Sequence, residues 1–89
     1  MFRRRTATLR DLELLYRERR GDFERVASAV AGTADLGADA VHDAFVRAVA
    51  SRSGFRGDAP LEAWLWRIVL NEARKRRAES YVRLLRCFT

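Results

Sequence analysis

With 89 residues, the chain is long enough for one small domain with a single modest core. Hydrophobic residues make up 48% of the chain, which excludes a wholly disordered protein. The 18 Lys and Arg residues outnumber the 12 Asp and Glu residues, and the net charge of +6 favours a polyanionic partner, either nucleic acid or an anionic membrane surface.

The cysteine content and the hydropathy narrow the cellular setting. The single cysteine, Cys87, excludes an internal disulfide framework and a zinc site built from several cysteines. No stretch approaches the roughly 20 apolar residues that a membrane-spanning helix needs. The basic residues 3–5 are not followed by the apolar segment of a signal peptide. We therefore expect a soluble, cytoplasmic protein without a membrane partner.

Apolar residues recur at helical spacing between residues 8 and 30 and predict a first helix there. Gly21 lies inside this pattern, so a kink or a break into two shorter helices stays open. Gly32 is typical of a helix C-terminus, and residues 32–35 are expected to form a loop. Residues 1–8 are expected to form a basic N-terminal tail.

A second apolar stripe predicts a helix over about residues 37–51. Asp35 and Asp39, near its start, suit the positive end of the helix dipole. Residues 53–58 contain two glycines that permit unusual backbone angles, and they predict the next connection.

A third helix is expected to begin near Asp58, whose side chain can cap it, with Pro60 in the first turn. Its apolar arc is wide, so we expect it to be the central helix, and its predicted end is the cationic run 74–77. Residues 80–89 carry spaced apolar side chains and predict an amphipathic C-terminal tail with a further helical turn or two.

Catalysis has little support in the sequence. His42 is the only histidine, and no other histidine is present to form a dyad with Cys87. Asp39 and Asp43 can approach each other on one helix face, which we interpret as a solvated acidic surface. We therefore expect no enzymatic activity, no metal and no small-molecule cofactor.

Binding to nucleic acid has more support. Arg67, Asn71 and Arg74 follow the spacing i, i+4, i+7 and share one narrow polar stripe. Arginine can hold a phosphate or stack on a base, and asparagine can read a base edge. Trp64 and Trp66 could supply stacking surfaces, although a place in the core is the alternative, which we favour for Trp64. The cationic run has its own alternative, because positive charge suits a helix C-terminus.

The blocks Asp39–Ala48 and Phe55–Ile68 resemble region 2 of bacterial sigma factors, and most closely the extracytoplasmic-function branch of the sigma-70 family. The similarity covers about residues 12–79, and its most specific part is the Phe-Arg-Gly-Asp-Ala-Pro-Leu sequence followed by Ala-Trp-Leu. With the helical patterns above, it implies an all-α fold. We expect a compact three-helix bundle, with a fourth short helix as the alternative, in a domain over residues 9–79.

The resemblance also implies a function in transcription initiation. A domain of this kind binds core RNA polymerase and recognises and melts the −10 promoter element by capturing a flipped base of the non-template strand. Docking on the clamp helices of the largest polymerase subunit is expected from the second helix, through Asp39, His42, Asp43, Val46 and Arg47. Contact with −10 DNA is expected from Phe55, Arg56, Asp58, Trp66, Arg67, Asn71, Arg74 and Lys75.

Several positions depart from the family pattern. His42 replaces the usual glutamine, Val49 replaces an aromatic residue, and Lys75 stands where an acidic residue is frequent. The family's second domain, which reads the −35 element, is not found in the 89 residues. This leaves a rival interpretation, a truncated sigma-like protein that occupies polymerase or an anti-sigma factor without initiating. A second rival is a general basic nucleic-acid binder, and an anti-sigma factor is a further candidate partner.

Overall fold

The computed structural model describes residues 7–88 and is entirely helical apart from its connections. Three α-helices, α1 (Leu9–Ala31), α2 (Ala34–Ala50) and α3 (Leu61–Cys87), are joined by a short turn and by a connection that contains the 3₁₀ helix η1 (Arg52–Gly54). The expected all-α, three-helix fold is thereby confirmed. Of the predicted basic tail, residues 1–6 lie outside the described residues, and Thr8 is already the N-cap of α1.

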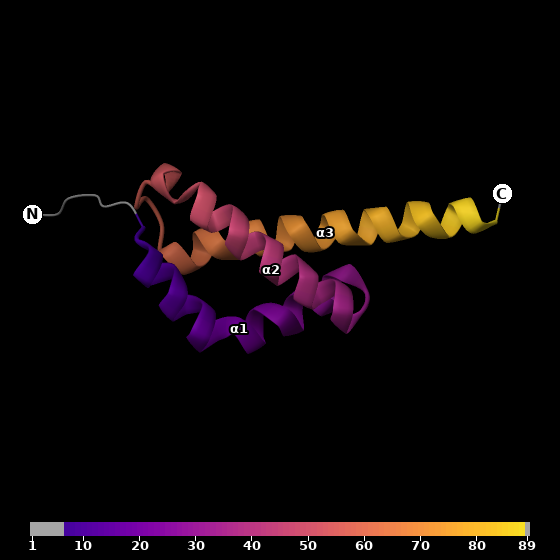
Figure 1. The fold of residues 1–89 in the computed structure, drawn as a ribbon, viewed down its shortest axis with the longest axis horizontal. Helices are drawn as coiled ribbons and strands as arrows, with labels where there is room; N and C mark the ends of the chain where they lie inside the picture. Colours follow the sequence, from indigo (N-terminus) through magenta and orange to yellow (C-terminus); the bar gives the residue numbers. More distant parts are fainter. Residues whose placement is uncertain (1–6, 89) are drawn as a thin grey trace, which may run out of the picture.

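Helix α1 is fixed at both ends by local sequence. The Thr8 Oγ1 accepts a hydrogen bond from the backbone N–H of Asp11, and the Asp11 carboxylate accepts one from the N–H of Thr8, both at 3.1 Å. This capping box satisfies two otherwise unpaired amides. Gly32, with φ of 110°, ends the helix in the left-handed conformation. The helix runs unbroken through Gly21 and follows a curved path in Figure 1, so the alternative of two shorter helices is wrong.

Helix α2 begins three residues earlier than expected. Thr33 is its N-cap, and the Thr33 Oγ1 accepts a hydrogen bond from the Leu36 N–H at 3.1 Å. The predicted loop over residues 32–35 is therefore reduced to Gly32 and Thr33. A threonine in this position stabilises the start of α2, because its hydroxyl accepts a hydrogen bond from an amide that the first turn leaves without a helical partner.

Helix α3 differs from expectation at both ends. Asp58 does not cap it: the N-cap position is Pro60, and no side chain bonds to the first turn. At the other end the helix continues without a break to Cys87, so residues 80–87 are its last turns and not a separate fourth helix. Figure 1 shows this part of α3 extending well past the other two helices, and the molecule is 60 Å long but only 22 and 17 Å across.

The core lies where the three helices meet. Phe23 from α1 is fully buried, with its ring centroid 5.6 Å from that of Phe45 in α2 and 4.5 Å from that of Trp66 in α3. Small residues let the helices come close, and the remaining core consists of Leu12, Ala27, Ala31, Ala40, Val41, Ala44, Ala48, Leu65, Val69 and Ala73. Within residues 7–88, no helix combines the length and the apolar character needed to cross a membrane.

The closest approach between α1 and α2 depends on one glycine. Gly37 is buried, and a Cβ placed there would lie 2.6 Å from the backbone N and Cα of Ser28. Real Cβ atoms do not come this near to backbone atoms, so a larger residue must push the helices apart. Gly21, in the exposed middle of α1, has nothing within 4 Å of the same position.

These two glycines give a matched pair of variants. We expect Gly37→Ala to destabilise the fold by about 1–3 kcal/mol, because it overpacks the contact between α1 and α2. Gly21→Ala should instead stabilise it by about 0.5–1 kcal/mol, because alanine loses less backbone entropy in a helix. Urea unfolding followed by circular dichroism measures both. Equal effects of the two substitutions would contradict the assigned close contact.

Candidate functional site

The connection between α2 and α3 folds into a pocket against the first turns of α3. The pocket has a volume of about 320 Å³. The rings of Phe55 and Trp64 lie 5.4 Å apart and form an aromatic pair beside it. Gly57, with φ of 82°, supplies a backbone angle that a side chain would strain. The lining residues are Gly54, Phe55, Arg56, Gly57, Asp58, Ala59, Ala63, Trp64 and Arg67.

Backbone hydrogen bonds tie the first part of this connection to the end of α2. The N–H of Gly54 donates to the Ser51 carbonyl at 2.8 Å, and the N–H of Phe55 donates to the Arg52 carbonyl at 3.1 Å. The Arg52 guanidinium donates to the Val49 carbonyl at 2.6 Å, where α2 ends and its last carbonyls lack helical partners. Phe55 therefore leaves η1 in a fixed direction, and its half-buried ring packs on α3.

An exposed polar stripe continues from the pocket along α3. Arg67 lines the pocket, and Asn71 and Arg74 follow it one and two turns further on, all three exposed. Lys75, also exposed, lies one turn beyond Asn71. The fold thus joins seven of the eight residues predicted for DNA contact into one surface, the pocket–stripe surface: Phe55, Arg56, Asp58, Arg67, Asn71, Arg74 and Lys75.

Trp66, the eighth predicted DNA residue, lies elsewhere. Its ring packs on Phe23 in the core, and its indole N–H donates to the Glu62 carboxylate at 3.3 Å. It therefore faces α1. Trp64 is half-buried and packs against the core, as the sequence favours, and it is also the tryptophan that lines the pocket. Periodicity alone could not separate the two, because both sit at the edge of a wide apolar arc.

The residues predicted for polymerase contact divide into two groups on α2. Asp39, His42 and Val46 are exposed and follow one another along one face. Asp43 and Arg47 turn toward α3 instead, where each forms an ion pair: Asp43 with Arg76, and Arg47 with Glu72 at 2.6 Å. Asp39, His42 and Val46 are therefore the exposed members of the set that form no ion pair with α3.

Glu72 is the one charged residue in the described chain that is buried. Its carboxylate lies 2.6 Å from the Arg47 Nε and 3.8 Å from a guanidinium nitrogen of Arg76, whose side chain is itself only 16% exposed. A buried carboxylate is costly unless cations and hydrogen bonds compensate for the lost water. The two arginines provide that compensation and couple α2 to α3.

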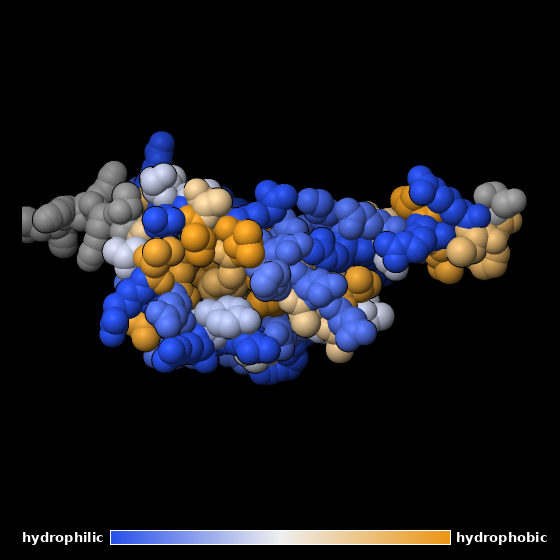
Figure 2. Space-filling view, in the orientation of Figure 1, coloured by the Kyte–Doolittle hydropathy of each residue, from blue (hydrophilic) through white to orange (hydrophobic). Residues whose placement is uncertain are grey.

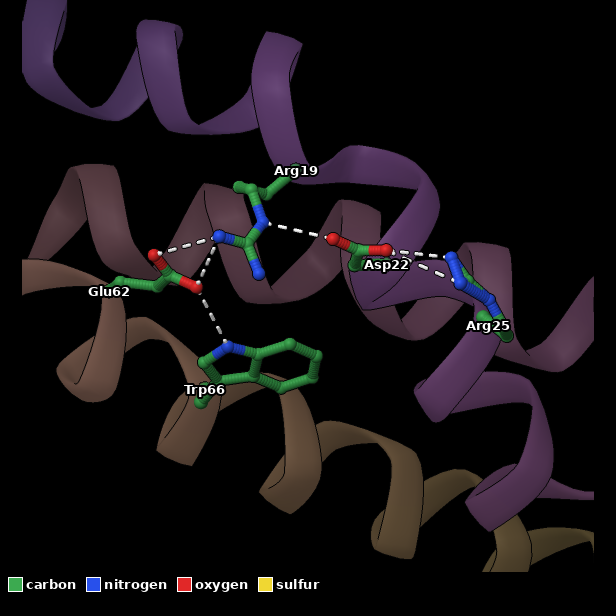
Figure 3. Close-up of polar contacts among 5 residues, drawn as sticks. All are labelled: Arg19, Asp22, Arg25, Glu62 and Trp66. Carbon is green, nitrogen blue, oxygen red and sulfur yellow. Dashed lines mark hydrogen bonds and ion pairs between the residues drawn. The ribbon is translucent and has the colours of Figure 1, made fainter.

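A second polar network joins α1 to the start of α3 (Figure 3). The Arg19 guanidinium lies 3.0 Å from Asp22 and 3.1 Å from Glu62, so that it bridges the two helices. Arg25 also pairs with Asp22, at 2.6 Å, and Glu62 accepts the indole N–H of Trp66. These groups are partly exposed, so each pair contributes at most about 1 kcal/mol. Their effect is to orient the first turns of α3, which carry the pocket.

The pKa of one exposed arginine, Arg20, is shifted by its neighbours. The hydrogen bond to Glu24, together with the neighbouring Tyr16, raises the pKa of the Arg20 guanidinium above its ordinary value. Arg20 lies 5.4 Å above the Tyr16 ring in a cation–π contact. Arg20 is exposed and Tyr16 is half-buried against Phe45, and neither residue belongs to the pocket–stripe surface. In residues 7–88, no group of three or more His, Cys, Asp and Glu side chains is placed to hold a metal ion.

A comparison with protein families matches residues 15–84 to Sigma-70 region 2. The chain belongs to this family. The matched span contains every residue predicted for polymerase or DNA contact and extends about five residues further along α3 than the similarity expected from the sequence. Searches of curated proteins and of solved structures gave no match.

Membership of the Sigma-70 region 2 family gives the pocket–stripe surface a context. Domains of this family are non-enzymatic parts of transcription factors that act in initiation, and the family implies interaction with RNA polymerase and promoter DNA. The two sets of exposed residues lie on separate helices, α2 and α3.

Sequence reasoning missed the buried charge pair in this Sigma-70 region 2 domain. The sequence places Arg76 in the cationic run 74–77 and assigns Glu72 no predicted role. A signal was present, because Leu65, Val69, Glu72 and Arg76 follow the spacing i, i+4, i+7, i+11 and therefore share the core face of α3. A carboxylate on an apolar face, followed by arginine one turn later, indicates an internal ion pair.

The two arginines of one helix provide a test of this network. We expect Arg76→Met to destabilise the fold by about 1–3 kcal/mol, because Glu72 and Asp43 lose their shared cation. Arg74→Met makes the same chemical change at an exposed position of α3 and should alter stability by no more than about 0.5 kcal/mol. Urea unfolding compares them. Similar losses in both variants would show that the charge network does not stabilise the contact between α2 and α3.

Proposed function

We propose that this chain is the polymerase-binding and −10-recognising domain of a sigma factor of the extracytoplasmic-function type. The observation that carries the proposal is the pocket–stripe surface. An aromatic pair and the charged side chains of Arg56 and Asp58 border a pocket, which continues into the four exposed cationic or amide side chains of the stripe. A flipped base needs a stacking surface and groups that read its edge, and its flanking phosphates need cations.

Each part of this surface has a distinct proposed role. Phe55 and Trp64 supply the stacking surface that offsets the few kcal/mol lost when a base leaves the duplex. Arg56 and Asp58 offer a donor and an acceptor for the edge of that base. Arg67 and Arg74 hold phosphates on either side of Asn71, and Lys75 adds a further cation.

We infer that polymerase docks on α2 through Asp39, His42 and Val46. These side chains are exposed, and the acidic end of the group is suited to steer a basic partner into register. Asp43 and Arg47 act differently, since their ion pairs to α3 hold the docking helix in its orientation. The family resemblance supports the clamp helices of the largest subunit as the partner.

DNA binding separates stacking from phosphate contact. We expect Phe55→Ala to weaken binding of single-stranded DNA by about 1–3 kcal/mol per base stacked on the ring, with an unchanged salt dependence. Arg67→Ala and Arg74→Ala should each lower the slope of log affinity against log salt by about 0.7, because each removes one phosphate contact. Fluorescence anisotropy of single-stranded oligonucleotides, with core polymerase present, measures both quantities.

The control for this experiment is Arg10→Ala, at an exposed arginine of α1 outside the pocket–stripe surface. It should leave the affinity and the salt slope close to those of the unmodified protein. If Phe55→Ala changes the salt slope, or if Arg67→Ala and Arg74→Ala leave it unchanged, the assignment of stacking and phosphate contacts is wrong.

Polymerase docking is tested by a charge reversal on α2. We expect Asp39→Lys to reduce co-purification with core RNA polymerase at least tenfold, because it places a like charge against a basic surface. Glu18→Lys makes the same change at an exposed position of α1 and should bind as before. Run-off transcription from genomic templates then distinguishes an initiator, which yields specific transcripts, from a protein that occupies polymerase and only suppresses them.

A further inference from the structure

The last turns of α3 carry an exposed apolar surface with two aromatic rings. Tyr81 is 63% and Phe88 is 78% exposed, which makes them the two most exposed large hydrophobic side chains in the described chain. Figure 2 shows apolar side chains at this end of the molecule, which extends past α1 and α2. An exposed group of apolar side chains is typical of a binding surface.

The two rings lie in line with two arginines of the pocket–stripe surface. Arg67, Arg74, Tyr81 and Phe88 follow one another at intervals of seven residues, and we call these four residues the α3 row. Seven residues are almost two turns of an α-helix, so each member is rotated by only about 20° from the one before it. Helix α3 is unbroken between them, and Phe88, its C-cap, has helical backbone angles (φ −95°, ψ −4°).

The α3 row faces away from the bundle. All four members are exposed, whereas Leu65, Val69 and Glu72 are buried on the other side of the helix. At one end, Arg67 lines the pocket. The row is therefore continuous with the pocket–stripe surface and leads from the pocket to the end of α3.

The charge beside the rings is positive. Arg74 and Lys75 are exposed within two turns of Tyr81, and neither forms an ion pair in the part of the chain that the structure describes. Glu79 is the only acidic residue between residues 73 and 88. It projects about 160° away from Tyr81, on the other side of the helix. The row therefore favours an anionic ligand.

We propose that the α3 row binds a single strand of nucleic acid, with phosphates held by Arg67 and Arg74 and unpaired bases stacked on Tyr81 and Phe88. This inference rests on the proposed function, because the strand reaches the rings from the pocket–stripe surface. Proteins that bind single strands combine cations that follow the backbone with aromatic rings on which bases stack. The two rings lie about 10 Å apart along the helix axis, which is the length of about three nucleotides in a stacked strand.

The order of side chains in the row favours a strand over a lipid surface. A lipid surface takes up the apolar face of an amphipathic helix and leaves the cations on the polar face. In the α3 row the two arginines and the two rings share one face and follow one another along it. A single strand presents both phosphates and bases to such a line, so one ligand can satisfy all four side chains.

The affinity for oligothymidine of two lengths tests the proposal. A strand of about six nucleotides covers the pocket and the two arginines, and one of about twelve also reaches the rings. Fluorescence anisotropy with the full chain should show that the longer strand binds at least about fivefold more tightly, which is the smallest gain expected from one stacked base. In the variant with Tyr81→Leu and Phe88→Leu, both strands should bind with equal affinity.

The matched control is the variant with Val82→Ala and Leu84→Ala. It removes exposed apolar atoms on the two sides of the α3 row and keeps both rings. The gain on the longer strand should therefore persist. All four substituted side chains are exposed, and circular dichroism should show the same helix content in both variants.

Photocross-linking identifies the side chains that contact bases. 5-Iodouracil is placed at successive positions of the longer oligothymidine, and irradiation joins it to a neighbouring aromatic ring. Mass spectrometry after digestion should find Tyr81 and Phe88 linked to positions about three nucleotides apart. Phe55 or Trp64, beside the pocket, should be linked nearer the other end of the strand.

Two results would overturn the proposal while leaving the proposed function in place. The first is a gain on the longer strand that is absent from the unmodified chain or persists without the two rings. The second is binding to phosphatidylglycerol vesicles that is lost in the Val82→Ala and Leu84→Ala variant, with no cross-link to the tail, which would assign this end of α3 to a lipid surface. A failure of the proposed function differs, because Arg67→Ala and Arg74→Ala then no longer weaken binding of the shorter strand, and both inferences are wrong.

Discussion

The packing of one ring, Phe23, determines how the helices of this domain are placed. It is fully buried and contacts Phe45 of α2 on one side and Trp66 of α3 on the other. Because each helix supplies one aromatic ring, none can rotate without leaving a void, and voids in a close-packed core are costly. The face of α2 that carries Asp39, His42 and Val46 and the pocket–stripe surface of α3 are both exposed, because the opposite faces of those helices are held by this contact.

Charged groups in the domain divide into those that hold the fold and those that face outward. Glu72, Arg76, Asp43 and Arg47 bind one another across α2 and α3, and Arg19 and Glu62 connect α1 to α3. Arg67, Arg74 and Lys75 are exposed on the other side of α3. Within residues 7–88, six of the 12 carboxylates form ion pairs with six arginines elsewhere in the bundle, and none of these pairs includes a cation of the exposed stripe on α3. The cations of this stripe are therefore concentrated on one side of α3.

Hydropathy patterns predicted the number of helices, their approximate places and the exposed stripe on α3. They did so because each helix buries one face, and the period of 3.6 residues marks that face in the sequence. The limits of the helices were less predictable. Thr33 starts α2 through a single hydroxyl. Helix α3 continues to Cys87 although its last turns cover no core, so a helix end predicted from the buried face alone falls too early.

The candidate site was predictable in its residue types but not in its geometry. The loop and stripe residues were recognised from their spacing and from the family resemblance, and the fold brings seven of them together. Trp64 and Trp66 lie only two residues apart and both pack against the core, so their different partners, Phe55 and Phe23, depend on tertiary contacts. The pairing of Asp43 and Arg47 with α3 likewise depends on how the helices cross.

Because α3 is a single unbroken helix, its two ends are angularly locked. Arg67 and Leu85 differ by 18 positions, about five full turns, and so project in the same direction from the axis. Deleting one residue between Arg77 and Tyr81 would swing everything beyond it by about 100° while leaving the earlier turns untouched. Adding four residues would restore the direction within about 40° and displace the end by about 6 Å. Insertions or deletions in this segment therefore keep the relative direction of the two ends of α3 only when their length is close to a whole number of helical turns.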